Sequence, residues 1–177
     1  MAAQDIAQAL RRAETVLGRK PAMGLHEDAP AMARWDKDLK VLTSHASGTS
    51  IATDMPRELG GGGQHVTPGW LFRAGVASCV STRIAMAAVA QGISLEALET
   101  VVSSRSDTRG IFGMADPDGT AVSAGPRDVE LRVRISAPGI ARQRLQELVE
   151  SSCRCSPMLC AMEAAVPVAL RVEVGAA

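Results

Sequence analysis

Cysteines are the residues of this sequence best suited to chemistry. The chain has four in 177 residues, and three of them, Cys153, Cys155 and Cys160, lie close together in the stretch SSCRCSPMLCAM. The fourth, Cys79, lies far upstream in a long apolar segment. Thiolates act as nucleophiles, metal ligands and disulfide partners. The cluster therefore indicates a metal site, a redox partner for Cys79, or small residues that fill a core.

A metal site at the cluster would use soft sulfur ligands. The thiols and thioethers available there suit copper(I) or zinc, and they are Cys153, Cys155, Met158, Cys160 and Met162. The spacing is not that of a zinc ribbon, and all three histidines lie far away in the sequence. We therefore expect no metal and no other cofactor. A redox pair with Cys79 and packing in an Ala-rich core both stay open.

The composition excludes several classes of partner. Aromatic residues make up 2% of the chain and tyrosine is absent, so Ala, Val, Leu, Ile and Met must build the core. The formal net charge is zero, which gives no general attraction to nucleic acid or to anionic membranes. So few aromatic rings also make a base-stacking surface improbable. We expect neither a nucleic acid nor a membrane as partner.

The N-terminal stretch predicts an amphipathic helix over residues 1–20. Its apolar residues follow helical spacing, and Gly18 is a natural stop. The stretch lacks the apolar run of a signal peptide, so we expect a cytoplasmic protein whose thiols stay reduced. A Pro- and Gly-containing linker follows over residues 21–33, and one domain occupies residues 34–177.

A long buried helix is predicted for residues 68–91. Thr67 can cap its start, Pro68 suits the first helical position, and apolar residues cover nearly every face. Arg73 and Arg83 argue against a membrane span. Four consecutive glycines precede it without the Gly-Lys-Ser/Thr of a phosphate-binding loop, so they indicate a turn.

Strand patterns flank this helix. Alternating apolar and polar residues predict one-sided strands, and a second amphipathic helix lies between the last two. We expect two strands around the turn at Ser47-Gly48, strands at 98–106, 129–136 and 166–174, and a helix at 140–152. This order of elements predicts an α+β domain.

Several stretches together resemble the OsmC/Ohr family of thiol-dependent organic hydroperoxide reductases and their relatives. They are RELGGGGQHVTPGWLFRAGVASC, AQGISLEALE, SDTRGIFGM and the final helix with its Ser-Pro turn and Val-Pro-Val strand. The resemblance runs from about Trp35 to Val174. It implies an OsmC-like fold, in which curved antiparallel sheets surround a long buried central helix. It also implies an intertwined homodimer with active sites at the interface.

The resemblance also implies the roles of particular residues. Cys79 stands where the family's thiolate attacks the peroxide, and Arg83, one turn later, can stabilise that thiolate. Two positions depart from the family. Gly69 replaces a glutamate, and Ser156 stands at the second cysteine, as it often does in the subgroup with the TRGIFG element.

A shifted cysteine could still resolve the sulfenic acid that forms on Cys79. Cys155 precedes Ser156 directly, and Cys153 lies two positions earlier. One residue moves a Cα atom by about 3.8 Å, and a disulfide needs Cα atoms within about 7 Å, so Cys155 is the better candidate.

Two functions follow from the resemblance. The first is a peroxidase that reduces organic hydroperoxides, with Cys79 as nucleophile, Cys155 or Cys153 as resolving thiol, and an external dithiol as reductant. The second is a non-peroxidase relative that binds a small apolar or thiol-reactive ligand at the dimer interface. Gly69 and Ser156 favour the second function, whereas Cys79, Arg83 and the spare thiols favour the first.

Overall fold

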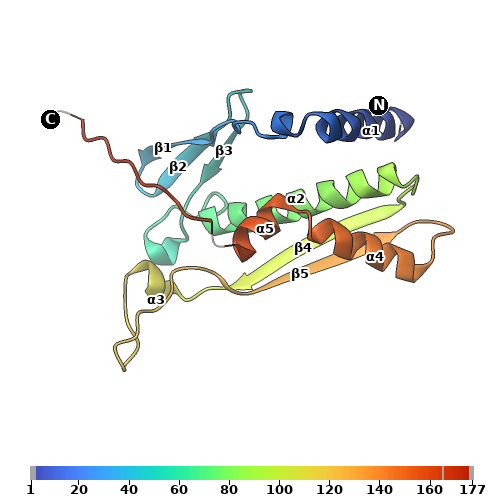
Figure 1. Ribbon diagram of the computed structural model, residues 1–177. Helices are drawn as coiled ribbons and strands as arrows, with labels where there is room; N and C mark the ends of the chain where they lie inside the picture. The colour runs from blue at the N-terminus through green and yellow to red at the C-terminus, as the bar shows by residue number, and fades with distance from the viewer. Residues whose placement is uncertain (1–2, 165, 176–177) are drawn as a thin grey trace.

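The computed structural model describes residues 3–164 and 166–175. Within these residues, helices pack on antiparallel sheets, which confirms the predicted α+β class (Figure 1). The elements are α1 (Ala3–Arg19), η1 (Pro21–Gly24), β1 (Met32–Lys37), β2 (Lys40–Ser44), β3 (Ser50–Thr53), η2 (Arg57–Leu59), α2 (Pro68–Ala90), β4 (Ala97–Arg105), α3 (Thr108–Ile111), β5 (Arg127–Ser136), α4 (Arg142–Cys153) and α5 (Pro157–Glu163).

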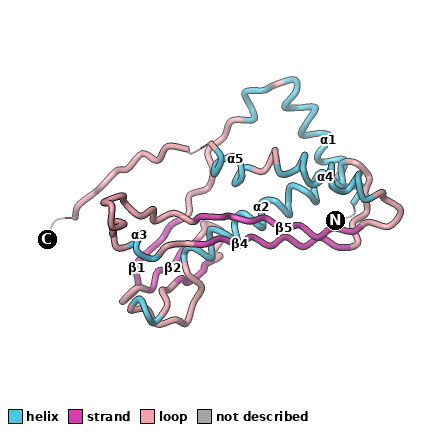
Figure 2. Tube along the Cα trace, turned by 90° about the horizontal axis from the view of Figure 1, so that it is seen from below, coloured by secondary structure: helices cyan, strands magenta, loops and turns pink. Residues whose placement is uncertain are grey.

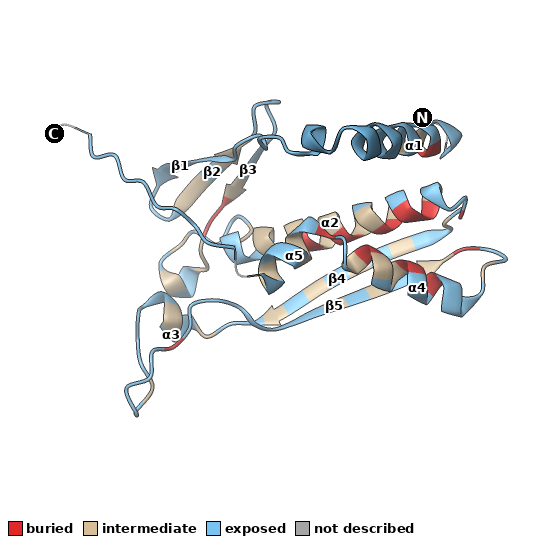
Figure 3. Ribbon diagram, viewed as in Figure 1, coloured by how far each residue is buried: buried red, intermediate tan, exposed pale blue. Residues whose placement is uncertain are grey.

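The long helix α2 forms where the sequence predicts it. The Thr67 side chain accepts a hydrogen bond from the backbone N–H of Trp70 at 3.2 Å, and Pro68 takes the first helical position. Val80 and Ile84 are fully buried and belong to the hydrophobic core. Figure 3 shows buried residues along α2. The length and apolar composition of α2 would be enough to cross a membrane. The buried core helices of soluble proteins meet the same two criteria.

The hairpin of β4 and β5 and the helix α4 cover one side of α2. Figures 1 and 2 show both helices on the same face of this antiparallel pair. Leu131, Val133 and Ile135 of β5 point toward the helices, as their alternation predicts. Leu148 of α4 is nearly inaccessible to solvent. A hydrogen bond of 2.8 Å from the Ser81 hydroxyl to the Thr100 hydroxyl joins α2 to β4.

The N-terminal sheet has one strand more than the sequence analysis expected. The segment before α2 forms the antiparallel strands β1, β2 and β3 in that order. The two strands predicted around Ser47-Gly48 are β2 and β3, which confirms that prediction, and β1 was missed. The extra turn lies at Asp38 and Leu39, where Asp38 adopts a positive φ of 51°. The Trp35 indole N–H donates to the Asp38 carbonyl at 2.9 Å and closes the turn. Asp38 suits a turn but Leu39 does not, so the sequence marks this turn only weakly.

The predicted strand at 166–174 is not formed in the single chain. Residues 166–175 are irregular, and they extend away from the other elements (Figures 1 and 2). Val168, Leu170 and Val174 are 92%, 84% and 89% exposed. Alternating apolar residues favour a strand, but a strand also needs a neighbouring edge that supplies hydrogen-bond partners. The sequence shows the alternation and cannot show whether one chain provides the edge.

The glycine run makes the tight connection before α2. Asp54 is buried, and its carboxylate accepts a hydrogen bond of 2.7 Å from the Met55 backbone N–H. Gly61 packs so closely on this pair that a Cβ atom there would overlap the Met55 carbonyl oxygen. The run thus lets the backbone fold over Asp54, in keeping with the predicted turn.

Replacing Gly61 by alanine should destabilise the protein. The added methyl group must displace backbone atoms of Met55, and overpacking of this kind costs about 1–3 kcal/mol. Gly18→Ala is the matched control, because its Cβ would meet nothing within 4 Å in the last turn of α1. Urea unfolding of both variants checks the expectation. Equal stability of Gly61→Ala and wild type would contradict the close approach.

An arginine fixes the loop that contains α3. The Arg109 guanidinium pairs with Asp107 at 2.6 Å and with Asp116 at 2.8 Å. The Asp107 carboxylate also accepts the Arg109 backbone N–H at 3.1 Å and so caps α3. These bonds hold the loop while Ile111 and Phe112 stay exposed. Arg109 lowers the pKa of Asp107 to about 2 through its side-chain and backbone hydrogen bonds.

The loop should therefore keep its order in mild acid. A carboxylate with a lowered folded-state pKa stabilises the fold above its ordinary value of 3.8, and this contribution is lost as the pH falls toward about 2. An NMR titration of the Asp107 carboxyl should give a midpoint near 2. Arg109→Gln should move the midpoint toward 3.8, whereas Arg105→Gln should not. An unshifted midpoint in wild type would refute this arrangement.

Candidate functional site

The structure brings Cys79 and Ser156 into contact. The Ser156 hydroxyl donates a hydrogen bond to the Cys79 sulfur, with 3.3 Å between Oγ and Sγ. Cys79 lies half-buried on α2, and Ser156 is fully buried at the junction of α4 and α5. The two residues lie 77 positions apart, so only the packing of α5 on α2 unites them.

The chain around Ser156 explains its fixed position. Its backbone N–H donates to the Cys153 carbonyl at 3.0 Å, and its carbonyl accepts from the Cys160 N–H at 2.9 Å. Pro157 begins α5 directly afterwards. On the opposite side, Gly75 of α2 leaves room for α5, since a Cβ there would lie 3.7 Å from the Met158 methyl carbon. Ser156 is therefore held by hydrogen bonds to the end of α4 and the start of α5, and by the close approach of α5 to α2.

The three clustered cysteines lie in different surroundings. All four cysteines of the chain are free thiols. Cys153 packs against the core, and burial raises its thiol pKa, which Arg154 offsets only in part. Cys155 is exposed, and the exposed Cys160 thiol donates to the Arg154 carbonyl at 3.5 Å. No group of three potential metal ligands among His, Cys, Asp and Glu was found within the described residues.

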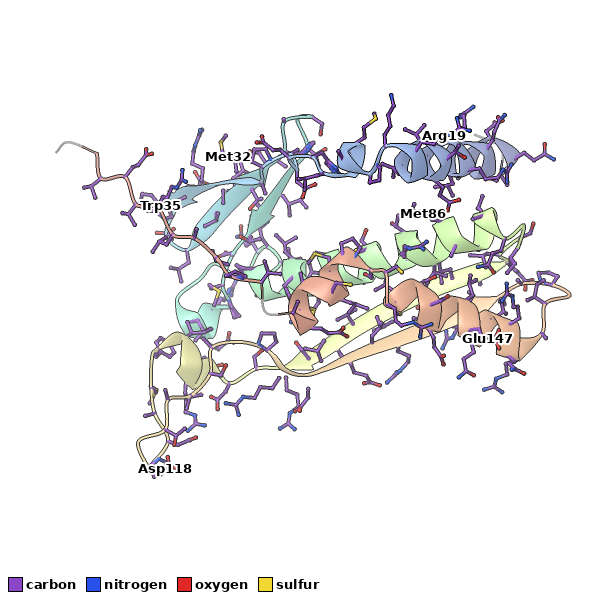
Figure 4. All side chains as sticks on the ribbon, in the orientation of Figure 1. Arg19, Met32, Trp35, Met86, Asp118 and Glu147 are labelled. Carbon is purple, nitrogen blue, oxygen red and sulfur yellow. The ribbon has the colours of Figure 1, made fainter. Side chains whose placement is uncertain are left out.

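Arg83 faces a groove between α1 and α2. This groove of about 370 Å³ also contains Leu10, Glu14 and Leu17 of α1 and Met86 of α2, whose side chain lies on the side toward α1 in Figure 4. Arg83 makes no hydrogen bond or ion pair with any residue that the structure describes. The expectation that it serves Cys79 stays a prediction.

The start of α2 carries the other departure from the family pattern. Gly69 is exposed, and a Cβ atom there would lie 3.8 Å from the Arg73 guanidinium. Arg73 instead donates to the Ser104 hydroxyl at 3.3 Å. Arg57, in the loop before α2, donates to the Gly62 carbonyl at 3.3 Å. Sequence reasoning missed the Arg73 contact because Ser104 belongs to a distant strand.

A larger groove lies between β5 and α4. It measures about 1010 Å³, and apolar side chains of both elements line it, among them Leu131, Val133, Leu145 and Val149. Cys153 contributes to its wall, whereas Cys79 does not. The single chain therefore leaves an apolar surface open beside the free edge of β5.

Comparison with known proteins identifies the family. A family model described as OsmC-like protein matches residues 61–171, which is more than half of the chain. The chain belongs to the OsmC-like family. The match begins at Gly61 and so does not include α1. A search of curated proteins found no match.

Solved structures of OsmC-like proteins share the fold. An OsmC-like protein of Mycoplasma pneumoniae gives a TM-score of 0.64 at 17% identity, over 78% of this chain and 89% of that one. The organic hydroperoxide resistance protein OsmC of Legionella pneumophila gives 0.55 at 23% identity, over 78% and 90%. An organic hydroperoxide resistance protein of Elizabethkingia anophelis gives 0.56 at 16% identity, over 78% and 89%. These comparisons confirm the predicted family and fold class.

Proposed function

We propose that this protein is a thiol-dependent peroxidase that reduces organic hydroperoxides at Cys79. The observation that carries the proposal is the Cys79 sulfur, half-buried on α2 and held by the Ser156 hydroxyl at 3.3 Å. A fixed, partly exposed sulfur can be reached by a peroxide and still be kept in one orientation. The names of the Legionella and Elizabethkingia relatives support the same chemistry.

The first step is a nucleophilic displacement on oxygen. The Cys79 thiolate attacks one peroxide oxygen, the O–O bond breaks, and the departing alkoxide takes up a proton to become an alcohol. The sulfur is oxidised to a sulfenic acid, and the peroxide is reduced. In the predicted second step, the thiol of Cys155 or Cys153 attacks the sulfenic sulfur of Cys79, which forms a disulfide and releases the oxygen as water. An external dithiol then restores both thiols and is itself oxidised to a disulfide.

We also propose that two copies form a homodimer. The extended residues 166–175 expose a row of apolar side chains, and β5 has a free edge beside the apolar groove under α4. The face of α2 that carries Ser78, Thr82 and Met86 is exposed as well. A strand from a second copy along β5 would cover the groove and would supply the hydrogen-bond partners that the segment lacks.

A second candidate function is the binding of a small apolar or thiol-reactive ligand without turnover. Gly69 and Ser156 favour it, because the glutamate and the second cysteine expected from the resemblance are replaced. In this case Cys79 would stay reduced in the presence of a hydroperoxide.

Peroxide consumption by single-cysteine variants separates these functions. Cys79→Ser should reduce turnover of cumene hydroperoxide to the uncatalysed rate, because the attacking sulfur is lost. Cys160→Ser is the matched control and should retain nearly full activity, since its exposed thiol donates to the Arg154 carbonyl and not to Cys79. Equal activity in Cys79→Ser and wild type would end the peroxidase proposal.

A charged side chain introduced into the C-terminal segment tests the proposed homodimer. Leu170→Glu should convert the dimer to a monomer, because it places a carboxylate in the row of apolar side chains that we expect to be buried. Arg171→Glu, on the neighbouring polar position, should stay dimeric. Size-exclusion chromatography with light scattering measures the mass of both variants. A monomeric wild-type protein would refute the proposal.

A further inference from the structure

We infer that an external monothiol, forming a mixed disulfide at Cys79 itself, resolves the oxidised sulfur in place of a second cysteine of the chain. This inference rests on the proposed peroxidase function and names its reducing substrate. It differs from the sequence-based prediction, which assigns that step to Cys155 or Cys153.

The position beside Cys79 is already taken by Ser156. Its hydroxyl is in contact with the sulfur, and the side chain is fully buried. A hydroxyl group cannot form a disulfide, so the residue that contacts the sulfur is unable to resolve it. The backbone bonds of Ser156 to Cys153 and Cys160 fix this turn. Another sulfur could reach the same place only if the turn were rebuilt.

The neighbouring thiols are poorly placed for that role. Cys153 packs against the core and lines the β5–α4 groove, and Cys79 is not among the residues that line this groove. Burial also raises the pKa of the Cys153 thiol, which favours its protonated, less nucleophilic form. Cys155 is exposed to solvent, while its neighbour Ser156 is buried against Cys79. Cys160 directs its thiol toward the Arg154 carbonyl.

The reaction balances with two equivalents of monothiol. The first thiolate attacks the sulfur of the sulfenic acid on Cys79, which gives a mixed disulfide and releases the oxygen as water. The second thiolate attacks the external sulfur of this mixed disulfide, which restores the Cys79 thiol and leaves a symmetrical disulfide of the monothiol. The two electrons that reduced the peroxide thus come from two external thiols. The reductant must be small, because Cys79 is half-buried.

Mapping of the oxidised cysteine tests this inference. Reduced wild-type protein receives one equivalent of cumene hydroperoxide with dimedone, which traps sulfenic acid, and without any added thiol. We expect the loss of one thiol per chain and a dimedone adduct at Cys79. In a parallel sample, 2-mercaptoethanol replaces dimedone, and we expect its mixed disulfide at Cys79 followed by continued peroxide consumption.

Ser156→Cys provides the contrast. A thiol at this position would lie next to the Cys79 sulfur, and we expect a disulfide between the two with loss of the dimedone adduct. Ser151→Cys is the matched control. Its hydroxyl bonds to the Leu148 carbonyl on the preceding turn, so the added thiol should leave the adduct at Cys79 intact. A persistent adduct in Ser156→Cys would show that position 156 is not the resolving place and would overturn the inference.

The other outcomes are distinguishable. A wild-type disulfide mapped between Cys79 and Cys155 or Cys153, with two thiols lost per chain, would overturn the inference and leave the peroxidase function intact. Cys79 that stays reduced while the peroxide persists would overturn both. Peroxide consumption that a dithiol sustains and a monothiol does not would also refute the inference.

Discussion

The burial of α2 is the constraint on which the rest of the structure depends. This helix is apolar on nearly every face, so no single neighbour can shield it from water. The β4–β5 hairpin and α4 cover one side, and α1 and α5 each cover part of another. Val76, Val80 and Ile84 are fully buried as a result. Burial of each such side chain contributes about 1.5–3 kcal/mol, so α2 is an important source of the hydrophobic stabilisation.

The candidate site is a consequence of this packing. Because α5 must approach α2 closely, the chain places Gly75 opposite Met158, and one turn further on it places Cys79 opposite Ser156. A sulfur at such a helix contact keeps some exposure while its orientation is fixed by a neighbour. The same packing directs Cys153 into the core and leaves Cys155 at the surface. Three thiols that are close in sequence thereby acquire different chemical environments.

Local patterns predicted the elements that local forces determine. Thr67 and Pro68 mark the start of α2 because capping involves residues a few positions apart in the chain. Alternation locates β5 because its apolar face contacts the helices. The third N-terminal strand was missed because its turn depends on the positive φ of Asp38. The strand at 166–174 was predicted wrongly because alternation does not supply an edge. The family resemblance put Ser156 at the second cysteine, but its contact with Cys79 depends on helix packing that spacing alone does not describe.

The helices α5 and α1 pack on different turns of α2, so Cys79 and Arg83 have different neighbours although helical spacing places them on one face. Cys79 and Arg83 are one turn apart and should face the same direction. The turn with Cys79 lies under α5, whereas the turn with Arg83 lies under α1, which stands outside the family match. Arg83 therefore shares its groove with Glu14 and Met86 of a separate contact. Family pattern and helical spacing identify the same two residues, and in this chain Cys79 contacts Ser156 while Arg83 lines the groove beside α1.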